Sequence, residues 1–223
     1  TATVSITVNA VNDVPVANAS SFSTNEDNEG STTLTGNDGD PWSSTVDDQD
    51  LTFTIVSGVS NGTLSLNPST GEVTYDPDDN FNGSDSFTFT VTDDGTTDGS
   101  SDALTSTTAT VSITVNAVND VPTLTTINSQ ETSEETDITV DLSGSDVDIA
   151  TNGQTLTFTA TSSDPSIVAV STTSTGSSTA TLSLDVQDDA NGDVTVTVEV
   201  SDGNGGTAEQ DFTLTVTEVN DVP

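Results

Sequence analysis

The 223-residue chain contains no Lys, Arg, His, Cys or Met, and its 37 Asp and Glu residues give a formal net charge of −37. No carboxylate can therefore form an intramolecular salt bridge with a basic side chain, and the mutual repulsion of the acids opposes a compact state. Nucleic acids and anionic membranes are excluded as electrostatic partners, because nothing in the chain can displace counterions from phosphates. Divalent cations are the natural partners, and hard carboxylate oxygens favour calcium, Ca²⁺.

The missing residue types also limit the chemistry of the chain. Without Cys there are no disulfides, so bound metal ions are the more natural cross-links. Paired carboxylates can catalyse glycoside hydrolysis, but here the Asp pairs stand in polar loops with no apolar cleft around them. We therefore expect no enzymatic activity. No apolar run approaches the roughly 20 residues that span a bilayer, so direct membrane insertion is not expected.

An exact internal repeat predicts the domain organisation. Residues 1–15, TATVSITVNAVNDVP, recur unchanged at 108–122, and VNDVP returns at 219–223. A period of about 100 residues indicates tandem domains, and proline in each VNDVP stiffens the junction between them. We expect the last strand of a preceding repeat plus linker at 1–13, whole repeats at 14–120 and 121–221, and the start of the next linker or repeat at 222–223.

Apolar residues alternate with Thr and Ser in both repeats, which is typical of half-buried antiparallel strands. High net charge with few aromatic residues is also a mark of disorder, but a solvated acidic chain has no need of such alternation. The clearest stripe is Val194, Val196, Val198 and Val200, and we find no helical periodicity of useful length. The pattern predicts an all-β fold: tandem seven-stranded Ig-like or cadherin-like Greek-key β-sandwiches in an extended array.

The acidic residues are concentrated where the ends of such sandwiches would lie. If strands alternate in direction, linker residues Asn119 and Asp120 lie beside loops of both repeats. Gathering many carboxylates there would be unfavourable without a cation, and calcium binds six to eight oxygens. The alternative is that the acids simply occupy solvated loops, which explains their number but not their gathering. The expected partners at this junction are Glu26, Asp27, Asp146, Asp148 and Asp202.

Two further candidate metal sites follow from the same argument. Upstream, Asn12 and Asp13 of the first VNDVP are expected to meet Asp38, Asp40, Asp93 and Asp94. Downstream, Glu134 and Glu135 are expected to meet Asp221 of the third VNDVP.

The linkers and acidic motifs resemble the cadherin-like and bacterial immunoglobulin-like repeats of giant bacterial surface adhesins. The Asn-Asp of each VNDVP is similar to the calcium-binding linker of cadherins, Asp146-x-Asp148 resembles their DxD motif, and Glu26 resembles their early glutamate. A clear DRE motif is missing from the region between the fifth and sixth strands. The resemblance implies an extracellular or bacterial cell-surface location, with calcium and neighbouring repeats as partners. It implies calcium-stiffened extender repeats of an adhesin or fibre that mediates cell attachment.

Two other functions remain open at this point. Trp42, the only tryptophan, could be the platform of a carbohydrate- or protein-binding module, although a lone loop Trp more often covers its own core. Alternatively, the chain could be a protomer segment of a self-assembled extracellular filament, in which Thr- and Ser-rich faces of identical chains pack laterally. Tyr75, with Pro77 and Phe81, is interpreted as a structural corner that pins the loop between the fifth and sixth strands.

Overall fold

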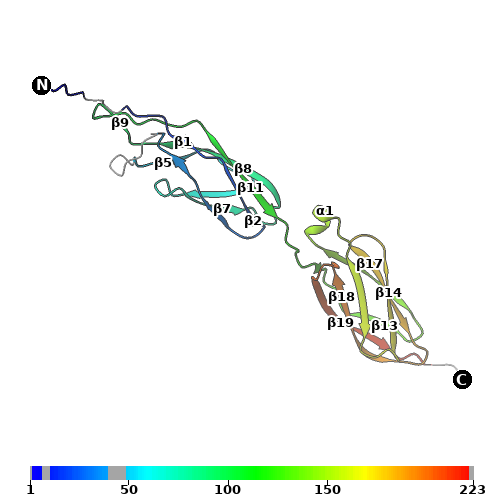
Figure 1. Cartoon of the computed structure of the whole chain (residues 1–223). Coiled ribbons are helices and arrows are strands. Elements are labelled where there is room, and N and C mark those ends of the chain that lie inside the picture. The colour runs from blue at the N-terminus through cyan, green and yellow to red at the C-terminus, as the bar shows by residue number, and fades with distance from the viewer. Residues whose placement is uncertain (1, 7–10, 40–48, 221–223) are drawn as a thin grey trace. The chain divides into compact units, whose positions relative to one another are not determined.

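The computed structural model describes residues 2–6, 11–39 and 49–220, so the predictions for Asp40, Trp42, Asp221 and 222–223 lie outside the described residues (Figure 1). The chain divides into two compact units, Thr1–Val118 and Asn119–Pro223. Each unit is a sandwich of two β-sheets. Residues 2–6, predicted to be the last strand of a preceding repeat, are not in a strand, and that assignment stays a prediction.

The first unit pairs its first and last long strands in parallel and its other strands antiparallel. One sheet has the order β2 (Ser20–Asn25), β11 (Ala109–Asn116), β8 (Gly83–Thr92), β5 (Thr52–Ser57). The other has the order β3 (Gly30–Thr33), β7 (Glu72–Pro77), β6 (Gly62–Leu66). Two short ladders complete the unit: β1 (Val16–Ala17) with β4 (Gly36–Asn37), and β9 (Thr96–Thr97) with β10 (Ser100–Ser101).

The second unit repeats this arrangement with longer strands. One sheet has the order β13 (Gln130–Ser133), β19 (Thr207–Thr217), β18 (Gly192–Ser201), β15 (Thr157–Ser162), again with a parallel first pair. The other has the order β12 (Thr123–Leu124), β14 (Ile138–Ser145), β17 (Thr179–Val186), β16 (Val168–Ser174). The predicted all-β sandwich is confirmed in both units.

One short helix, α1 (Asp148–Asn152), is an element that the sequence pattern did not predict. It lies between β14 and β15 and ends at Gly153, whose φ of 67° is the left-handed conformation that glycine adopts readily. A single turn is too short to produce a 3.6-residue apolar period, so no such period marks it.

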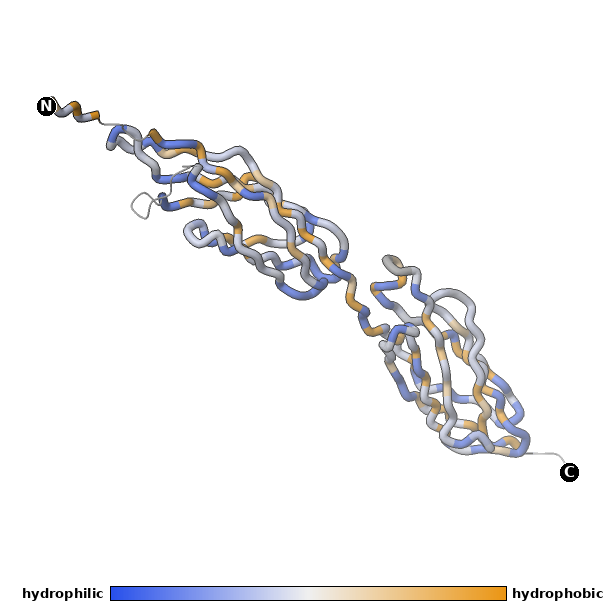
Figure 2. Tube along the Cα trace, in the orientation of Figure 1, coloured by the Kyte–Doolittle hydropathy of each residue, from blue (hydrophilic) through white to orange (hydrophobic). Residues whose placement is uncertain are grey.

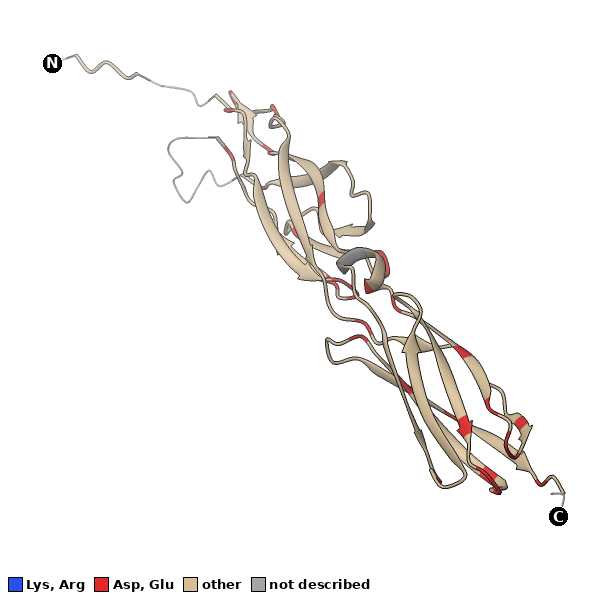
Figure 3. Cartoon of the chain, turned by 90° about the vertical axis from the view of Figure 1, so that its right-hand side faces the viewer, with Lys and Arg blue, Asp and Glu red and all other residues tan. Residues whose placement is uncertain are grey.

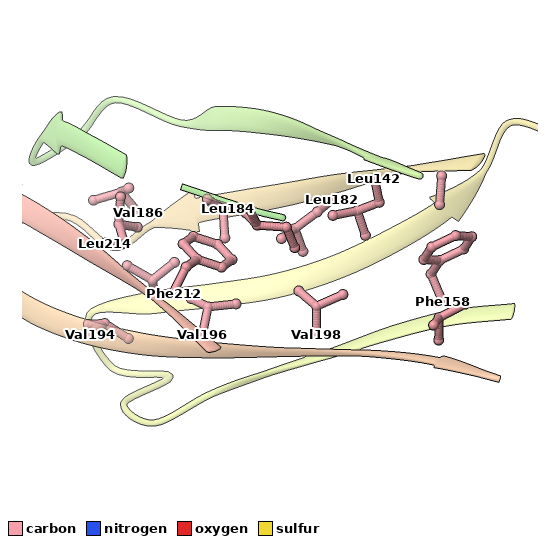
Figure 4. Close-up of a cluster of buried hydrophobic side chains, with 14 of the residues drawn as sticks. Leu142, Phe158, Leu182, Leu184, Val186, Val194, Val196, Val198, Phe212 and Leu214 are labelled. Carbon is pink, nitrogen blue, oxygen red and sulfur yellow. The ribbon is translucent and has the colours of Figure 1, made fainter. Parts of the chain in front are cut away.

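Each unit has its own apolar core. The predicted stripe on β18 is completely buried, with Val194, Val196, Val198 and Val200 all 0% exposed. Figure 4 shows three of these valines beside Phe212 of the adjacent strand β19, with Leu184 of β17 opposite them in the other sheet. Full burial of such a side chain contributes about 1.5–3 kcal/mol, and Figure 2 shows the matching alternation of hydropathy along the strands.

Tyr75 is a buried structural residue, and its hydroxyl contacts the loop between β5 and β6 rather than the loop that follows its own strand β7. Its ring is completely buried, and its hydroxyl donates a 2.8 Å hydrogen bond to the Asn61 carbonyl. Burial, together with the nearby charge of Asp85, raises the pKa of Tyr75 to about 12. The Asp85 carboxylate in turn accepts the backbone N–H groups of Ser60 and Asn61, so this pair fixes the loop between β5 and β6.

Substitution Asp85→Asn should destabilise the first unit in a pH-dependent way. Burial opposes ionisation of Asp85, but the N–H groups of Asn61, Ser86 and Ser60 outweigh it and lower the pKa of this carboxyl. A lowered pKa in the folded state adds stability above the unfolded-state pKa, and this is lost as pH falls through the folded-state value.

We expect the substitution to cost about 1–3 kcal/mol at pH 7, because N–H donors lose a charged acceptor. The difference in unfolding free energy between wild type and variant should shrink as pH falls below about 4. Urea unfolding at a series of pH values measures it. A difference that is constant from pH 7 to pH 3 would contradict this role of the charge.

Candidate metal centres

The incoming end of the first unit brings together Asn12 and Asp93, two of the predicted site residues. Asn12 Nδ2 donates to Asp93 Oδ1 over 3.1 Å, and the same oxygen accepts Leu104 N at 2.8 Å. Asp93 is only 3% exposed, and its second oxygen, Oδ2, is buried without a hydrogen-bond partner. Gly95 permits the contact, because a Cβ there would lie 2.0 Å from Asn12 Oδ1.

Three residues that the sequence did not single out also contact Asn12. Gln49 Nε2 donates to Asn12 Oδ1 over 2.8 Å, and Asn12 Nδ2 donates to the Asp102 carbonyl over 2.8 Å. Thr97 of β9 accepts the Asn12 N–H and donates to Asp102 Oδ2 over 2.6 Å. The β9–β10 hairpin therefore adds a carboxylate to this end.

The remaining predicted residues of this end differ in their surroundings. Asp13 is exposed and Asp38 is half-buried. Asp94, directly after Asp93, is exposed and accepts the backbone N–H of Asp50 at 2.8 Å.

The incoming end of the second unit repeats these contacts with other residues. Asn119 Nδ2 donates to Asp202 Oδ2 over 2.7 Å, and Gln154 Nε2 donates to Asn119 Oδ1 over 2.9 Å. Asp202 Oδ1 also accepts the N–H groups of Asn204 and Gly206. The amide of Asn119 lowers the pKa of Asp202; burial opposes it, and the backbone donors add to the lowering.

The DxD residues lie at the same end of the second unit. Asp120 N donates to Asp148 Oδ2 over 2.9 Å, and Asp148 N donates to Asp146 Oδ1 over 2.8 Å. Carboxylate oxygens of Asp120 and Asp148 lie within 4.8 Å of each other, and Asp148 is only 1% exposed. Asp146 Oδ2 and Gln154 Oε1 are buried without a hydrogen-bond partner. Five predicted residues are thus gathered here: Asn119, Asp120, Asp146, Asp148 and Asp202.

The outgoing ends of both units hold their linker with a buried glutamate. Glu26 N donates to the Asn116 carbonyl at the end of β11, and Glu26 Oε1 accepts Val118 N at 2.5 Å. Glu134 does the same at the end of β19, where it accepts Val219 N at 2.6 Å. The two glutamates are only 2% and 6% exposed. Each carboxylate therefore orients the first linker residues of its own unit.

The residues that follow these glutamates are exposed and occupy the left-handed region of a tight turn. Asp27 has a φ of 57° and Glu135 a φ of 62°. Asp27 Oδ1 accepts Asn80 N at 2.9 Å, and Asn82 Nδ2 donates to Glu26 Oε2 over 3.0 Å. The expected meeting of Glu26 and Asp27 with Asn119 and Asp120 stays a prediction, as does the downstream set around Glu134 and Glu135.

The incoming ends have the chemistry of a site for a hard divalent cation. Every candidate ligand is a carboxylate or side-chain amide oxygen, the donor types that calcium prefers. Buried carboxylates normally find a donor or a cation, and a chain without Lys, Arg or His has no cationic side chain to supply. The buried oxygen of Asp93 in the first unit therefore suits a calcium ion, and so, separately, do those of Asp146 and Gln154 in the second unit.

One sequence signal could have found the glutamine contacts. Gln49 and Gln154 both begin the pattern Gln-x-Leu-Thr-Phe-Thr, at 49–54 and 154–159, directly before the strand that carries the first buried Phe. In contrast, the role of Asp102 depends on the β9–β10 hairpin, which has no counterpart in the described part of the second unit.

Solved structures with a similar fold are cadherin ectodomains. The protocadherin gammaB7 EC3-6 cis-dimer structure matches with a TM-score of 0.59 and 16% identity, over 94% of this chain and 49% of that one. The protocadherin gamma B2 extracellular cadherin domains 3-6 match with a TM-score of 0.56 and 16% identity, over 92% and 53%. Human CDH23 EC21-23 gives a TM-score of 0.56 and 16% identity, over 93% and 70%. The chain thus spans about half the length of the two protocadherin structures, and no curated protein matches it.

Family comparisons assign both units. Residues 12–117 match the bacterial cadherin-like domain and residues 119–215 match the bacterial Ig domain. Such domains are typical of extracellular surface proteins and are typically structural, and the cadherin-like fold typically binds calcium. No helix among the described residues is long and apolar enough to cross a membrane. The chain is thus a tandem of repeats, a bacterial cadherin-like domain followed by a bacterial Ig domain.

Proposed function

We propose that the chain is a calcium-stiffened extender segment of a large secreted or cell-surface bacterial adhesin or fibre that mediates attachment. The observation that carries the proposal is the set of buried oxygens without a donor: Asp93 Oδ2, Asp146 Oδ2 and Gln154 Oε1. Leaving one such atom unsatisfied costs about 1–3 kcal/mol, and more for a charged group. A bound calcium ion would remove this cost and would neutralise part of the negative charge around it.

In the first domain, Asp93 would hold the ion beside Asn12. In the second domain, Asp120, Asp146 and Asp148 would hold a separate ion, with Gln154 as a neutral ligand. Calcium supplies a cross-link at these positions, since it joins loops that are distant in sequence. Asp202 orients the linker through Asn119, as Asp93 does through Asn12.

Stiffening follows from the way in which each domain holds the linker between them. Glu26 of the first domain accepts Val118 N, and Asp148 of the second accepts Asp120 N. The two N–H groups that these carboxylates hold are two residues apart, so at most about 7 Å of peptide chain separates them. Calcium bound to acids on both sides would restrict rotation about residues 118–120. The corresponding ligands downstream would be Glu134, Glu135 and Asp221.

Calcium titration of single variants tests the proposed sites. We expect Asp93→Asn to weaken binding at the first domain, and Asp146→Asn at the second, by at least about tenfold, or about 1.4 kcal/mol, since each removes a charged ligand. Isothermal titration calorimetry measures the affinity and the number of ions. Asp141→Asn is the matched control, because Asp141 is exposed on β14, outside the proposed sites.

Two results would overturn the proposal. One is a wild-type chain that takes up no calcium at millimolar concentration. The other is a loss of affinity in Asp141→Asn as large as that in Asp93→Asn and Asp146→Asn, which would indicate general charge attraction rather than sites.

A further inference from the structure

The outer face of one sheet in the first domain carries no acid. The four strands of the sheet β2–β11–β8–β5 contain a single carboxylate, Asp85, which lies on the inward-facing side of β8 and holds the loop between β5 and β6. The outward residues of these strands form the acid-free face, and they are Ser, Thr or Asn, apart from the exposed Val56 at the bulge of β5. The chain as a whole has 37 acids in 223 residues, or about one in six, which Figure 3 shows in red.

The equivalent face of the second domain is acidic. The two sheets can be compared position by position, because Val115 pairs with Gly83 at the start of β8, and Val216 pairs with Gly192 at the start of β18. Counted from these pairs, five outward positions that are acidic in the second domain are Ser or Thr in the first. They are Glu131 and Ser23, Asp193 and Ser84, Glu199 and Thr90, Glu209 and Thr108, and Asp211 and Thr110. The sandwich therefore tolerates acids on this face, and the fold alone does not account for their absence from the first domain.

Ser and Thr side chains make the acid-free face self-complementary. Each hydroxyl both donates and accepts hydrogen bonds, so the face can bond to a copy of itself without a charged partner. The methyl groups of Thr on β8 and β11 add apolar area. None of the outward residues is aromatic or charged, so the face lacks the usual anchors for a different partner.

We propose that the acid-free face is a lateral contact between two copies of the chain, which pack face to face across a two-fold axis. A two-fold contact uses the same patch on both copies, as a self-complementary face allows. Sheets packed face to face lie about 10 Å apart, so two chains of charge −37 approach with least repulsion where neither carries acids. None of the proposed calcium ligands lies in these four strands, so the contact is independent of the calcium sites.

The size of the face predicts a weak contact. Strands lie about 4.8 Å apart and rise about 3.3 Å per residue, so four strands of about eight residues cover roughly 500 Å². Two such faces bury roughly 1,000 Å², at the low end of specific interfaces, and we expect a dissociation constant on the order of 0.1–1 mM.

The charge distribution predicts how salt affects this contact. Exposed acids flank the face at its two ends: Asp50 before β5 and Asp94 after β8 at the incoming end, and Asp27 after β2 at the outgoing end. Charges separated by more than about 8 Å are largely screened at physiological ionic strength. Added NaCl should therefore weaken the repulsion between these acids of the two copies and strengthen the contact, the opposite of a contact that depends on opposite charges.

Sedimentation equilibrium of the full chain in a buffer with calcium tests the proposal. The wild type should move toward the dimer mass as its concentration rises to about 1 mM, and more readily in about 0.5 M than in about 0.05 M NaCl. Ser112 lies between Ser21 and Ser86 in the middle of the face. Ser112→Asp places a like charge there on each copy and should weaken association at least about tenfold.

Thr213→Asp is the matched control for this substitution. Thr213 of β19 occupies the position in the second domain that Ser112 occupies in the first, and both residues are exposed. The control adds the same charge to the chain but lies outside the acid-free face, so it should associate like the wild type. Calorimetry of both variants checks that each domain still folds.

A cysteine version locates the contact, because the chain has no Cys of its own. A bismaleimide with a spacer of about 10 Å matches the separation of two packed sheets. The faster of Ser86→Cys and Ser112→Cys should be captured as a dimer several-fold faster than Thr213→Cys.

Three outcomes would overturn the lateral contact: a wild type that stays monomeric at every concentration and salt, a Ser112→Asp variant that associates like the wild type, or a Thr213→Asp variant that is weakened equally. The first of these would leave the acid-free face to another kind of partner, such as a neutral polysaccharide. Each leaves the calcium titration unaffected, so failure of this inference is distinguishable from failure of the proposed function.

Discussion

Removal of calcium with excess EDTA should lower the melting temperature of the full chain by at least about 10 °C. An ion that binds only the folded state contributes about 2.7 kcal/mol when its free concentration is 100 times its dissociation constant. For a domain of about 100 residues, each kcal/mol shifts the melting temperature by about 4–8 °C. Chelation also restores the full repulsion of 37 carboxylates.

Differential scanning calorimetry at constant ionic strength measures this effect, with calcium-saturated EDTA as the control for the chelator itself. Small-angle scattering of the same samples measures stiffness, since loss of calcium should broaden the distribution of maximum dimensions. If EDTA changes neither the melting temperature nor the scattering, calcium does not stiffen the chain, and the chain is an acidic spacer without bound metal.

The second large effect is expected from the core of the Ig domain. Leu184 of β17 is completely buried against the second core, and Leu184→Ala should cost about 2–5 kcal/mol through lost transfer energy and the cavity left behind. Because the two cores are made of separate residues, the cadherin-like domain should keep its own transition. Calorimetry should then show one transition that moves to lower temperature by about 10 °C or more and one that stays.

Thr213→Ala is the control for this substitution, since Thr213 is exposed on the neighbouring sheet. Surface changes of this kind usually stay within about 0.5 kcal/mol. If Leu184→Ala lowers both transitions equally in the presence of EDTA, the two units unfold as one cooperative body, contrary to this expectation.

Much of the fold could be predicted from the sequence because it depends on local alternation. Val194, Val196, Val198 and Val200 must lie on one face of a strand, and burial of that face requires a second sheet. The repeated VNDVP similarly indicated tandem domains. The helix at Asp148 and the glutamine contacts to Asn12 and Asn119 were missed, because they depend on loop geometry rather than on a period.

The burial of individual acids could not be predicted from the sequence, even for neighbouring residues. Asp93 and Asp94 are the same residue type, yet Asp93 is buried with one oxygen unpartnered while Asp94 is exposed. Asp85, near the start of β8, accepts two backbone N–H groups and so holds the loop between β5 and β6. The composition fixes the number of carboxylates, but tertiary packing decides which of them are buried and which are exposed to solvent.

By itself, the sequence determined that the chain forms strands, which faces those strands bury and that no internal base neutralises its acids. These properties follow from residue type and from a two-residue period. The tertiary structure alone decided which acids are enclosed at the domain ends, because Asn12 with Asp93 and Asn119 with Asp202 meet across more than 80 residues of chain. Such contacts exist only when the sheets have brought distant loops together.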